Sequence, residues 1–87
     1  MLDAERRTVE LDGTIVALSP LEYGVMEVLH RARGHTVTRV GLLDQVWGAD
    51  QTCASNVVDV VVRTLRHKLG EHGRRIETVR GAGYRLV

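Results

Sequence analysis

The feature that most constrains this chain is the segment of residues 56–69, which has the pattern of a two-sided helix. Its apolar residues recur at the spacing of a helical stripe that faces a core. The stripe comprises Val58, Val61, Val62, Leu65 and Leu69. The other side carries Asn56, Asp59, Val60, Arg63, Thr64, Arg66 and His67. Such a helix can bury its apolar side in a domain and present a cationic, hydrogen-bonding side to a nucleic acid.

A strand is the competing interpretation of this segment, because residues 57–62 are mostly valine and β-branched side chains are stiff in a helix. The helical spacing nevertheless continues to Leu69, and Gly70 follows as a stop signal. Cationic side chains in the last turn also suit the negative end of a helix dipole. We therefore predict a helix, with Ser55 as its N-terminal cap.

Length and composition indicate one small globular domain. The 87 residues suffice for a single core, and 44% apolar with 26% charged residues is typical of a folded rather than a disordered chain. No apolar run approaches the roughly 18 residues of a membrane span, and no signal peptide opens the chain. The single cysteine, Cys53, cannot form an internal disulfide, so we expect a reducing cytoplasm as the location.

Charge is distributed unevenly, although the net charge is only +1. Residues 1–54 hold five Lys/Arg and eight Asp/Glu, whereas residues 55–87 hold seven and three. This asymmetry is compatible with a C-terminal half that faces a polyanion, and also with chance in a short chain.

The first 18 residues predict a small antiparallel sheet. Two β-rich runs, at 8–11 and 14–18, are separated by Asp12-Gly13, which is a strong hairpin signal. Residues 1–7 have a weaker pattern that allows one more short strand. We expect this sheet to cover one side of a helical core.

A first helix is predicted to begin after Ser19. Ser19 can cap it, Pro20 takes the first helical position, and Glu22 completes a capping box. Gly34 is placed to end the helix. Its expected apolar stripe comprises Leu21, Val25, Val28, Leu29 and Ala32.

A second helix is predicted after a short extended link at residues 36–38. Thr38 can cap it and Gly48 can end it, while Gly41 within it costs about 1 kcal/mol relative to alanine. The residues expected to pack inward are Val40, Leu42, Leu43, Val46 and Trp47. After a link at 70–75, β-rich runs at 76–79 and 83–87 predict a closing hairpin.

Four blocks of this sequence resemble the DNA-binding output domains of the OmpR/PhoB class of response regulators. They are Leu18-Ser-Pro-Leu-Glu-Tyr23, Leu42-Leu-Asp-Gln-Val-Trp-Gly48, the recognition-helix residues Val58-Asp-Val60, Arg63-Thr-Leu-Arg66 and Lys68-Leu69, and Glu77-Thr-Val-Arg-Gly-Ala-Gly-Tyr-Arg-Leu86. The resemblance covers about residues 8–87. It implies an α+β winged helix-turn-helix in one domain at 1–87, with an N-terminal antiparallel sheet at 1–18, a three-helix core at 19–70 and a C-terminal β-hairpin wing at 76–87. The family's N-terminal sheet usually has four strands, and this chain has room for about three.

The resemblance also implies a function: sequence-specific binding of double-stranded DNA in transcription regulation, as the output domain of a two-component response regulator. In the family, the third helix (here about 55–69) enters the major groove and the wing reaches the adjacent minor groove. The loop at about 48–54 can touch RNA polymerase, a homodimer on DNA is compatible with the family, and a receiver domain is expected upstream.

The residues expected to contact DNA are Asn56, Val60, Arg63, Thr64, Arg66, His67, Thr78 and Arg80. Arg63 and Arg66 match arginines of the family's recognition helix and are long enough to reach phosphates or a guanine edge. Val60 would meet a thymine methyl, Thr78 would bond a phosphate, and Arg80 suits the negative potential of a narrow minor groove. For Asp59, pairing with a nearby arginine is favoured over base reading, and for Tyr84 and Trp47 core packing is favoured.

This helix departs from the family pattern at several positions. Many relatives carry an arginine or another polar group, threonine and histidine where this chain has Asn56, Val57 and Val61. Thr64 stands where arginine is common. Fewer hydrogen-bonding groups are therefore available to specify a target.

The alternative function is that of a winged helix acting mainly as a protein-interaction module, with loop 48–54 and the valine-rich side contacting RNA polymerase or another domain. An enzyme finds no support, because the four histidines lack metal-ligand spacing with Cys53 or with a carboxylate cluster. There is also no phosphate-binding loop or dinucleotide fingerprint. We expect no catalytic residue, metal, cofactor, small-molecule substrate or membrane partner.

Overall fold

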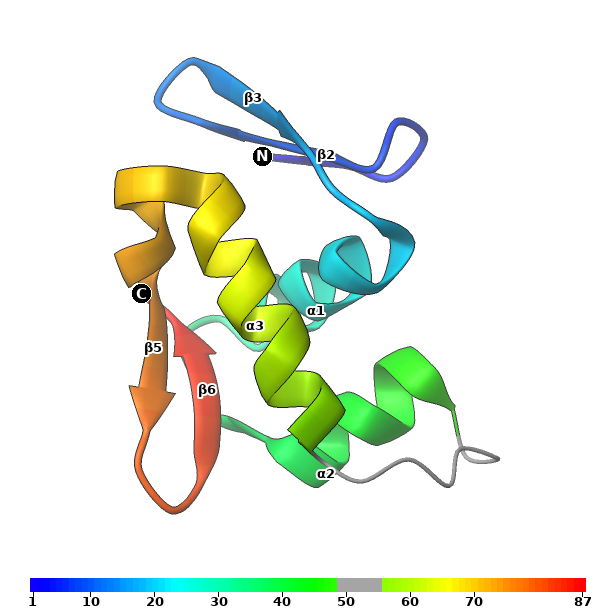
Figure 1. Cartoon of the computed structure of the whole chain (residues 1–87), viewed down its shortest axis with the longest axis vertical. Helices are drawn as coiled ribbons and strands as arrows, with labels where there is room; N and C mark the ends of the chain where they lie inside the picture. Colours follow the sequence, from blue (N-terminus) through cyan, green and yellow to red (C-terminus); the bar gives the residue numbers. More distant parts are fainter. Residues whose placement is uncertain (49–55) are drawn as a thin grey trace.

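The computed structural model of this chain describes residues 1–48 and 56–87 (Figure 1). Its N-terminal part comprises β1 (Leu2–Asp3), β2 (Thr8–Leu11), β3 (Thr14–Ala17) and α1 (Pro20–Arg31). The central part comprises β4 (Val37–Thr38), α2 (Arg39–Leu42), a π-helical turn (Leu43–Trp47) and α3 (Asn56–Leu69). A 3-10 helix (Gly70–Arg75), β5 (Ile76–Val79) and β6 (Gly83–Leu86) follow. The predicted succession of an N-terminal sheet, helices and a closing hairpin is confirmed.

The N-terminal sheet has the strand order β1-β2-β3, with antiparallel neighbours. Its turn at Asp12-Gly13 has positive φ at both residues, 50° and 82°, as the predicted two-residue hairpin requires. Val9 is buried against the helices, whereas Ile15 on the neighbouring strand is exposed. The sheet therefore covers one end of the helical core, above α1 and the C-terminal end of α3 in Figure 1.

Helix α1 begins with the predicted capping box. The Glu22 backbone N–H donates to Ser19 Oγ at 3.2 Å, and the Ser19 N–H donates to Glu22 Oε1 at 2.8 Å. The predicted stripe is wrong at Leu21, which is 39% exposed, and it omitted Tyr23 and Met26, which are buried. The reason is the ion pair that draws Glu22 inward, because Lys68 Nζ of α3 lies 2.8 Å from Glu22 Oε1.

The predicted second helix divides into one α-helical turn and a π-helical turn. Thr38 caps it, accepting a hydrogen bond from the Gly41 N–H at 2.9 Å. Leu42 is fully buried, but the prediction that Val40 packs inward is wrong, since Val40 is 68% exposed. Residues two apart on a helix point about 200° away from each other, so burying Leu42 turns Val40 outward. The other three predicted core residues, Leu43, Val46 and Trp47, are partly buried.

Helix α3 confirms the helical interpretation of the valine-rich segment. Its buried residues are Val58, Val62, Leu65 and Leu69, while Val61 is only half-buried. Residues 49–55, which include the predicted cap Ser55, Cys53 and most of loop 48–54, lie outside the described part of the chain.

The C-terminal sheet contains one strand more than the predicted hairpin. Its order is β4-β6-β5, because the link expected at 36–38 pairs with β6 through Val37–Tyr84 and Thr38–Gly83. Gly83 permits this pairing, since an added Cβ would lie 2.0 Å from the Val37 carbonyl oxygen. The hairpin is thereby hydrogen-bonded, through β6, to the segment that leads into α2. No helix in the described ranges is long and apolar enough to cross a membrane.

Candidate nucleic-acid interface

The predicted contact residues all lie on helix α3 and the β5–β6 hairpin. In Figure 1, the N-terminal end of α3 and the hairpin turn lie at the same end, opposite the N-terminal sheet. Burial of the apolar side of α3 leaves the other side in solvent. The exposed predicted residues on α3 are Asn56, Val60, Arg63, Thr64 and His67. Two exposed residues of the hairpin, Thr78 and Arg80, complete the predicted set apart from Arg66.

Two arginines of this set project from different elements. Arg63 lies on the exposed side of α3 and Arg80 in the turn between β5 and β6. Neither side chain forms a hydrogen bond or ion pair with another residue in the ranges 1–48 and 56–87. As far as these ranges go, both guanidinium groups have donors that an external anion could accept.

Arg66 corrects the sequence interpretation, which placed it on the outward side with Arg63. Its side chain is partly buried, and Nε and Nη2 donate to the Ile76 carbonyl oxygen at 3.1 and 2.6 Å. Nη2 also donates to Thr78 Oγ1 at 2.7 Å. The close approach of the 3-10 helix to α3 brings β5 within reach: an added Cβ on Gly73 would lie 2.5 Å from the Arg66 carbonyl oxygen. Arg66 and Thr78 thus bind each other.

Thr64 is exposed, but its hydroxyl is already bonded within the helix. Thr64 Oγ1 donates to the Val60 carbonyl oxygen at 3.1 Å, one turn back along α3. Val60 itself is 55% exposed, which is unusual for an apolar side chain in water. At these two positions α3 therefore presents methyl groups rather than a free hydroxyl donor.

A polar cluster connects α2, α3 and β6, and we call its four residues, Arg39, Asp59, Arg66 and Tyr84, the Tyr84 cluster. Asp59 accepts hydrogen bonds from the Tyr84 hydroxyl and from Arg39 Nε, the latter at 2.8 Å. The guanidinium carbons of Arg39 and Arg66 lie 5.2 and 5.6 Å from the centre of the Tyr84 ring. Both are within cation–π range of the ring.

The Tyr84 cluster confirms the predicted pairing of Asp59 with an arginine. The Tyr84 hydroxyl, and next the Arg39 guanidinium, hold the pKa of the Asp59 carboxyl below its ordinary value, against the opposing effect of burial. The pKa of Tyr84 is raised, first by burial and then by the Asp59 carboxylate. Arg39 was missed by the sequence analysis, because its partner Asp59 lies 20 residues further along the chain and no local pattern connects the two.

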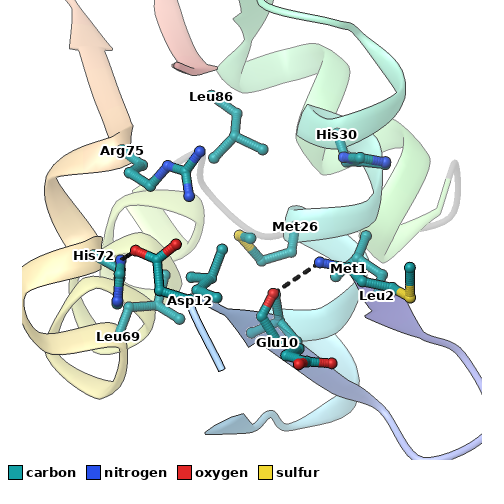
Figure 2. A pocket seen from close by; sticks show the side chains of 12 residues that line it. Met1, Leu2, Glu10, Asp12, Met26, His30, Leu69, His72, Arg75 and Leu86 are labelled. Carbon is teal, nitrogen blue, oxygen red and sulfur yellow. Dashed lines mark hydrogen bonds and ion pairs between the residues drawn. The ribbon is translucent and has the colours of Figure 1, made fainter. Parts of the chain in front are cut away.

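A cavity in the described part of the chain lies away from this surface (Figure 2). It has a volume of about 320 Å³ and lies between the N-terminal sheet, α1 and the C-terminal end of α3. Met26, Leu69 and Leu86 supply apolar wall, and His72 Nδ1 lies 3.8 Å from Asp12 Oδ2 at its rim. None of the predicted contact residues lines it. Within residues 1–48 and 56–87, no group of three or more His, Cys, Asp or Glu is placed to hold a metal ion.

Comparison with known proteins gives consistent matches over nearly the whole chain. The sequence profile of the family described as "Transcriptional regulatory protein, C terminal" matches residues 13–86. The transcriptional regulatory protein CutR of Streptomyces coelicolor is 47% identical over 85 residues, which cover 98% of this chain and 39% of CutR. This chain thus spans about two-fifths of the length of such relatives.

Solved structures agree with this match. The crystal structure of the DNA-binding domain of Bacillus subtilis CssR superposes with a TM-score of 0.84 and 31% identity, covering 100% of this chain and 98% of that one. The DNA-binding domain of the response regulator AdeR, solved in complex with an intercistronic region, has a TM-score of 0.84 and 27% identity, covering 99% and 90% of the two chains. Both likenesses extend over nearly the whole of this chain.

Proposed function

Because this chain belongs to the family of C-terminal effector domains of OmpR/PhoB-type transcriptional regulators, we propose that its exposed α3 side and hairpin turn bind double-stranded DNA sequence-specifically. The observation that carries the proposal is a pair of exposed arginines on neighbouring elements, Arg63 midway along α3 and Arg80 in the hairpin turn. Two cationic points on separate elements match a duplex, whose phosphates and grooves alternate along its surface.

We propose that α3 enters the major groove, which is wide enough for a helix and displays a distinct pattern for each base pair. Arg63 would bind a guanine edge or a phosphate, and Asn56 and His67 would add hydrogen bonds at the two ends of the helix. Val60 would contact a thymine methyl group, which gives its exposure a physical reason. Thr64 would contribute its methyl group, since its hydroxyl is bonded to the helix backbone.

The hairpin would make the second contact. Arg80 would enter the adjacent minor groove, where narrow A·T-rich stretches concentrate negative potential. We propose that Arg66 and Thr78 do not contact DNA directly, because their polar groups bind each other and the β5 backbone. Their contribution to DNA binding would then be indirect.

The proposal extends to the longer proteins in which such domains occur. This domain would follow a receiver domain in a two-component response regulator of the bacterial cytoplasm, and would bind DNA as a homodimer. Contact with RNA polymerase through loop 48–54 would then connect DNA binding to transcription. The support for this extension is the match to CutR, of which this chain covers 39%.

The test is selection of duplexes from a random library, followed by affinity measurements over a range of salt concentrations. Arg63→Ala and Arg80→Ala should each weaken binding about 10-fold or more, and each should lower the slope of log affinity against log salt by about 1. Arg6→Ala is the matched control, because Arg6 is exposed in the β1–β2 turn at the other end of the molecule. Binding that is independent of salt, or wild-type affinity in both test variants, would overturn the proposal.

A second candidate function is protein binding through the exposed valines. Val40 and Val60 are 68% and 55% exposed, on the two consecutive helices α2 and α3. A partner domain that covered both would also bury Val40, to which the proposed DNA contacts assign no role. Failure to select any duplex, together with binding of RNA polymerase that Val40→Ser and Val60→Ser weaken, would favour this function.

A further inference from the structure

The Tyr84 cluster joins three elements by side-chain contacts. Tyr84 belongs to β6, Arg39 to α2, and both Asp59 and Arg66 to α3. Through Arg66 the connection extends to the Ile76 carbonyl group of β5. The two strands of the hairpin are therefore each bonded to α3, at residues seven positions apart along the helix.

These contacts are directional, unlike the apolar packing that surrounds them. Apolar burial depends on area and has no preferred direction, so it specifies the position of a strand along a helix less sharply. Hydrogen bonds to charged groups are strong and depend on geometry, and they weaken steeply when the donor–hydrogen–acceptor angle falls below about 120°. The Arg66 fork fixes the beginning of β5 against α3, and the Asp59–Tyr84 bond fixes β6 one strand further on.

We propose that Asp59, Arg66 and Tyr84 are positioning residues that hold the hairpin turn, with Arg80, at a fixed offset from the exposed side of α3. The inference rests on the proposed DNA binding and identifies how its two contact points are made to act together. When one contact has formed, a rigid connection keeps the other at a high effective concentration at its own groove. A loose connection lowers this concentration, so the second contact adds less to affinity.

The experiment measures what Arg80 contributes in different backgrounds. In the otherwise unchanged domain, Arg80→Ala should weaken binding to a selected duplex about 10-fold; in an Arg66→Lys background it should weaken binding about 3-fold or less. Lysine keeps the charge but lacks the planar fork that bonds both Ile76 and Thr78. Tyr84→Phe, which removes only the hydroxyl that donates to Asp59, should give a value between these two.

Arg85→Lys is the matched control. Arg85 Nε bonds Glu77 within the hairpin, and this ion pair does not reach α3. In the Arg85→Lys background, Arg80→Ala should keep its full effect. An equal Arg80→Ala factor in all backgrounds would overturn the inference, even if Arg66→Lys lowered overall affinity, because a merely structural role lowers affinity uniformly.

A second measurement does not depend on DNA. Spin labels on His67→Cys and Ala82→Cys, in a domain that also carries Cys53→Ser, report the distance between α3 and the hairpin turn. Arg66→Lys and Tyr84→Phe should broaden the distance distribution, and Arg85→Lys should not. Broadening without selection of any duplex would refute the proposed function and leave the positioning role standing. An unchanged distribution would refute the positioning role whatever the DNA result.

Discussion

The two sheets of this domain are equally small, yet they are attached to the helices in different ways. The N-terminal sheet packs mainly through apolar groups, with Val9 buried and Leu11 and Val16 partly buried against the core. The C-terminal sheet adds the hydrogen bonds and cation–π contacts of Tyr84 and Arg66. A sheet that only covers a core needs burial, whereas a sheet that presents a hairpin at a set place also needs directional contacts.

The largest expected change in stability comes from a comparison of one glycine from each sheet. Gly83→Ala should destabilise the fold by about 3 kcal/mol or more, because a Cβ at 2.0 Å from the Val37 carbonyl oxygen would force β4 and β6 apart. Gly13→Ala should cost about 1 kcal/mol, since Gly13 has φ of +82° but nothing within 4 Å of an added Cβ. Urea unfolding followed by circular dichroism measures both.

The order of the two glycine variants is the informative result. If Gly13→Ala proved the more damaging, backbone strain in the N-terminal turn would outweigh strand contact in the C-terminal sheet. The view that the C-terminal sheet is the more tightly fitted of the two would then be wrong.

An intermediate loss of stability is expected when the carboxylate of the Tyr84 cluster, that of Asp59, is replaced. Asp59→Asn should cost about 1–2 kcal/mol at neutral pH, because it weakens hydrogen bonds to a charged group that is partly exposed. The pKa of Asp59 in the folded state is lowered from its ordinary value of 3.8, with the Tyr84 hydroxyl as the first favourable cause. The stabilisation is therefore present above about pH 4 and is lost as pH falls through the lower, folded-state pKa.

The check is unfolding free energy measured from pH 7 down to pH 2. The difference between the wild-type domain and Asp59→Asn should shrink as the pH falls below 4. A constant difference would show that the Asp59 charge does not contribute, and that only the shape of the side chain matters. The pKa of Glu22 is also lowered: burial acts to raise it, but Lys68 and Ser19 together lower it. Glu22 therefore makes both proteins lose stability in acid to a similar extent. The difference in unfolding free energy between the two proteins removes this shared effect.

Local patterns in the sequence predicted the elements well, and long-range contacts explain what they missed. The spacing from Val58 to Leu69 identified α3 despite its valines, and Asp12-Gly13 located a hairpin, because each signal lies within a few residues. The pairing of Val37 with Tyr84 has no such signal, since two residues cannot display a period.

The candidate site shows the same limit. A helical pattern assigns Arg66 to the polar side of α3, but it does not reveal that β5 passes close enough to bind its guanidinium group. Arg63, only three residues earlier, remains available in the described part of the chain. The outcome for each arginine is decided by which strand lies beside it, and this follows from the tertiary fold.

The smallest effect is expected at the ion pair of the N-terminal sheet. His72 Nδ1 lies 3.8 Å from Asp12 Oδ2, and the Asp12 side chain is 80% exposed (Figure 2). Solvent screens such a pair, and it forms only when the histidine is protonated, so Asp12→Asn should change stability by less than about 0.5 kcal/mol. Urea unfolding at pH 7 and at pH 5.5 measures it beside Asp59→Asn. A loss at pH 5.5 as large as that of Asp59→Asn would mean that a directional polar contact fastens the N-terminal sheet as well, and the contrast between the two sheets would fail.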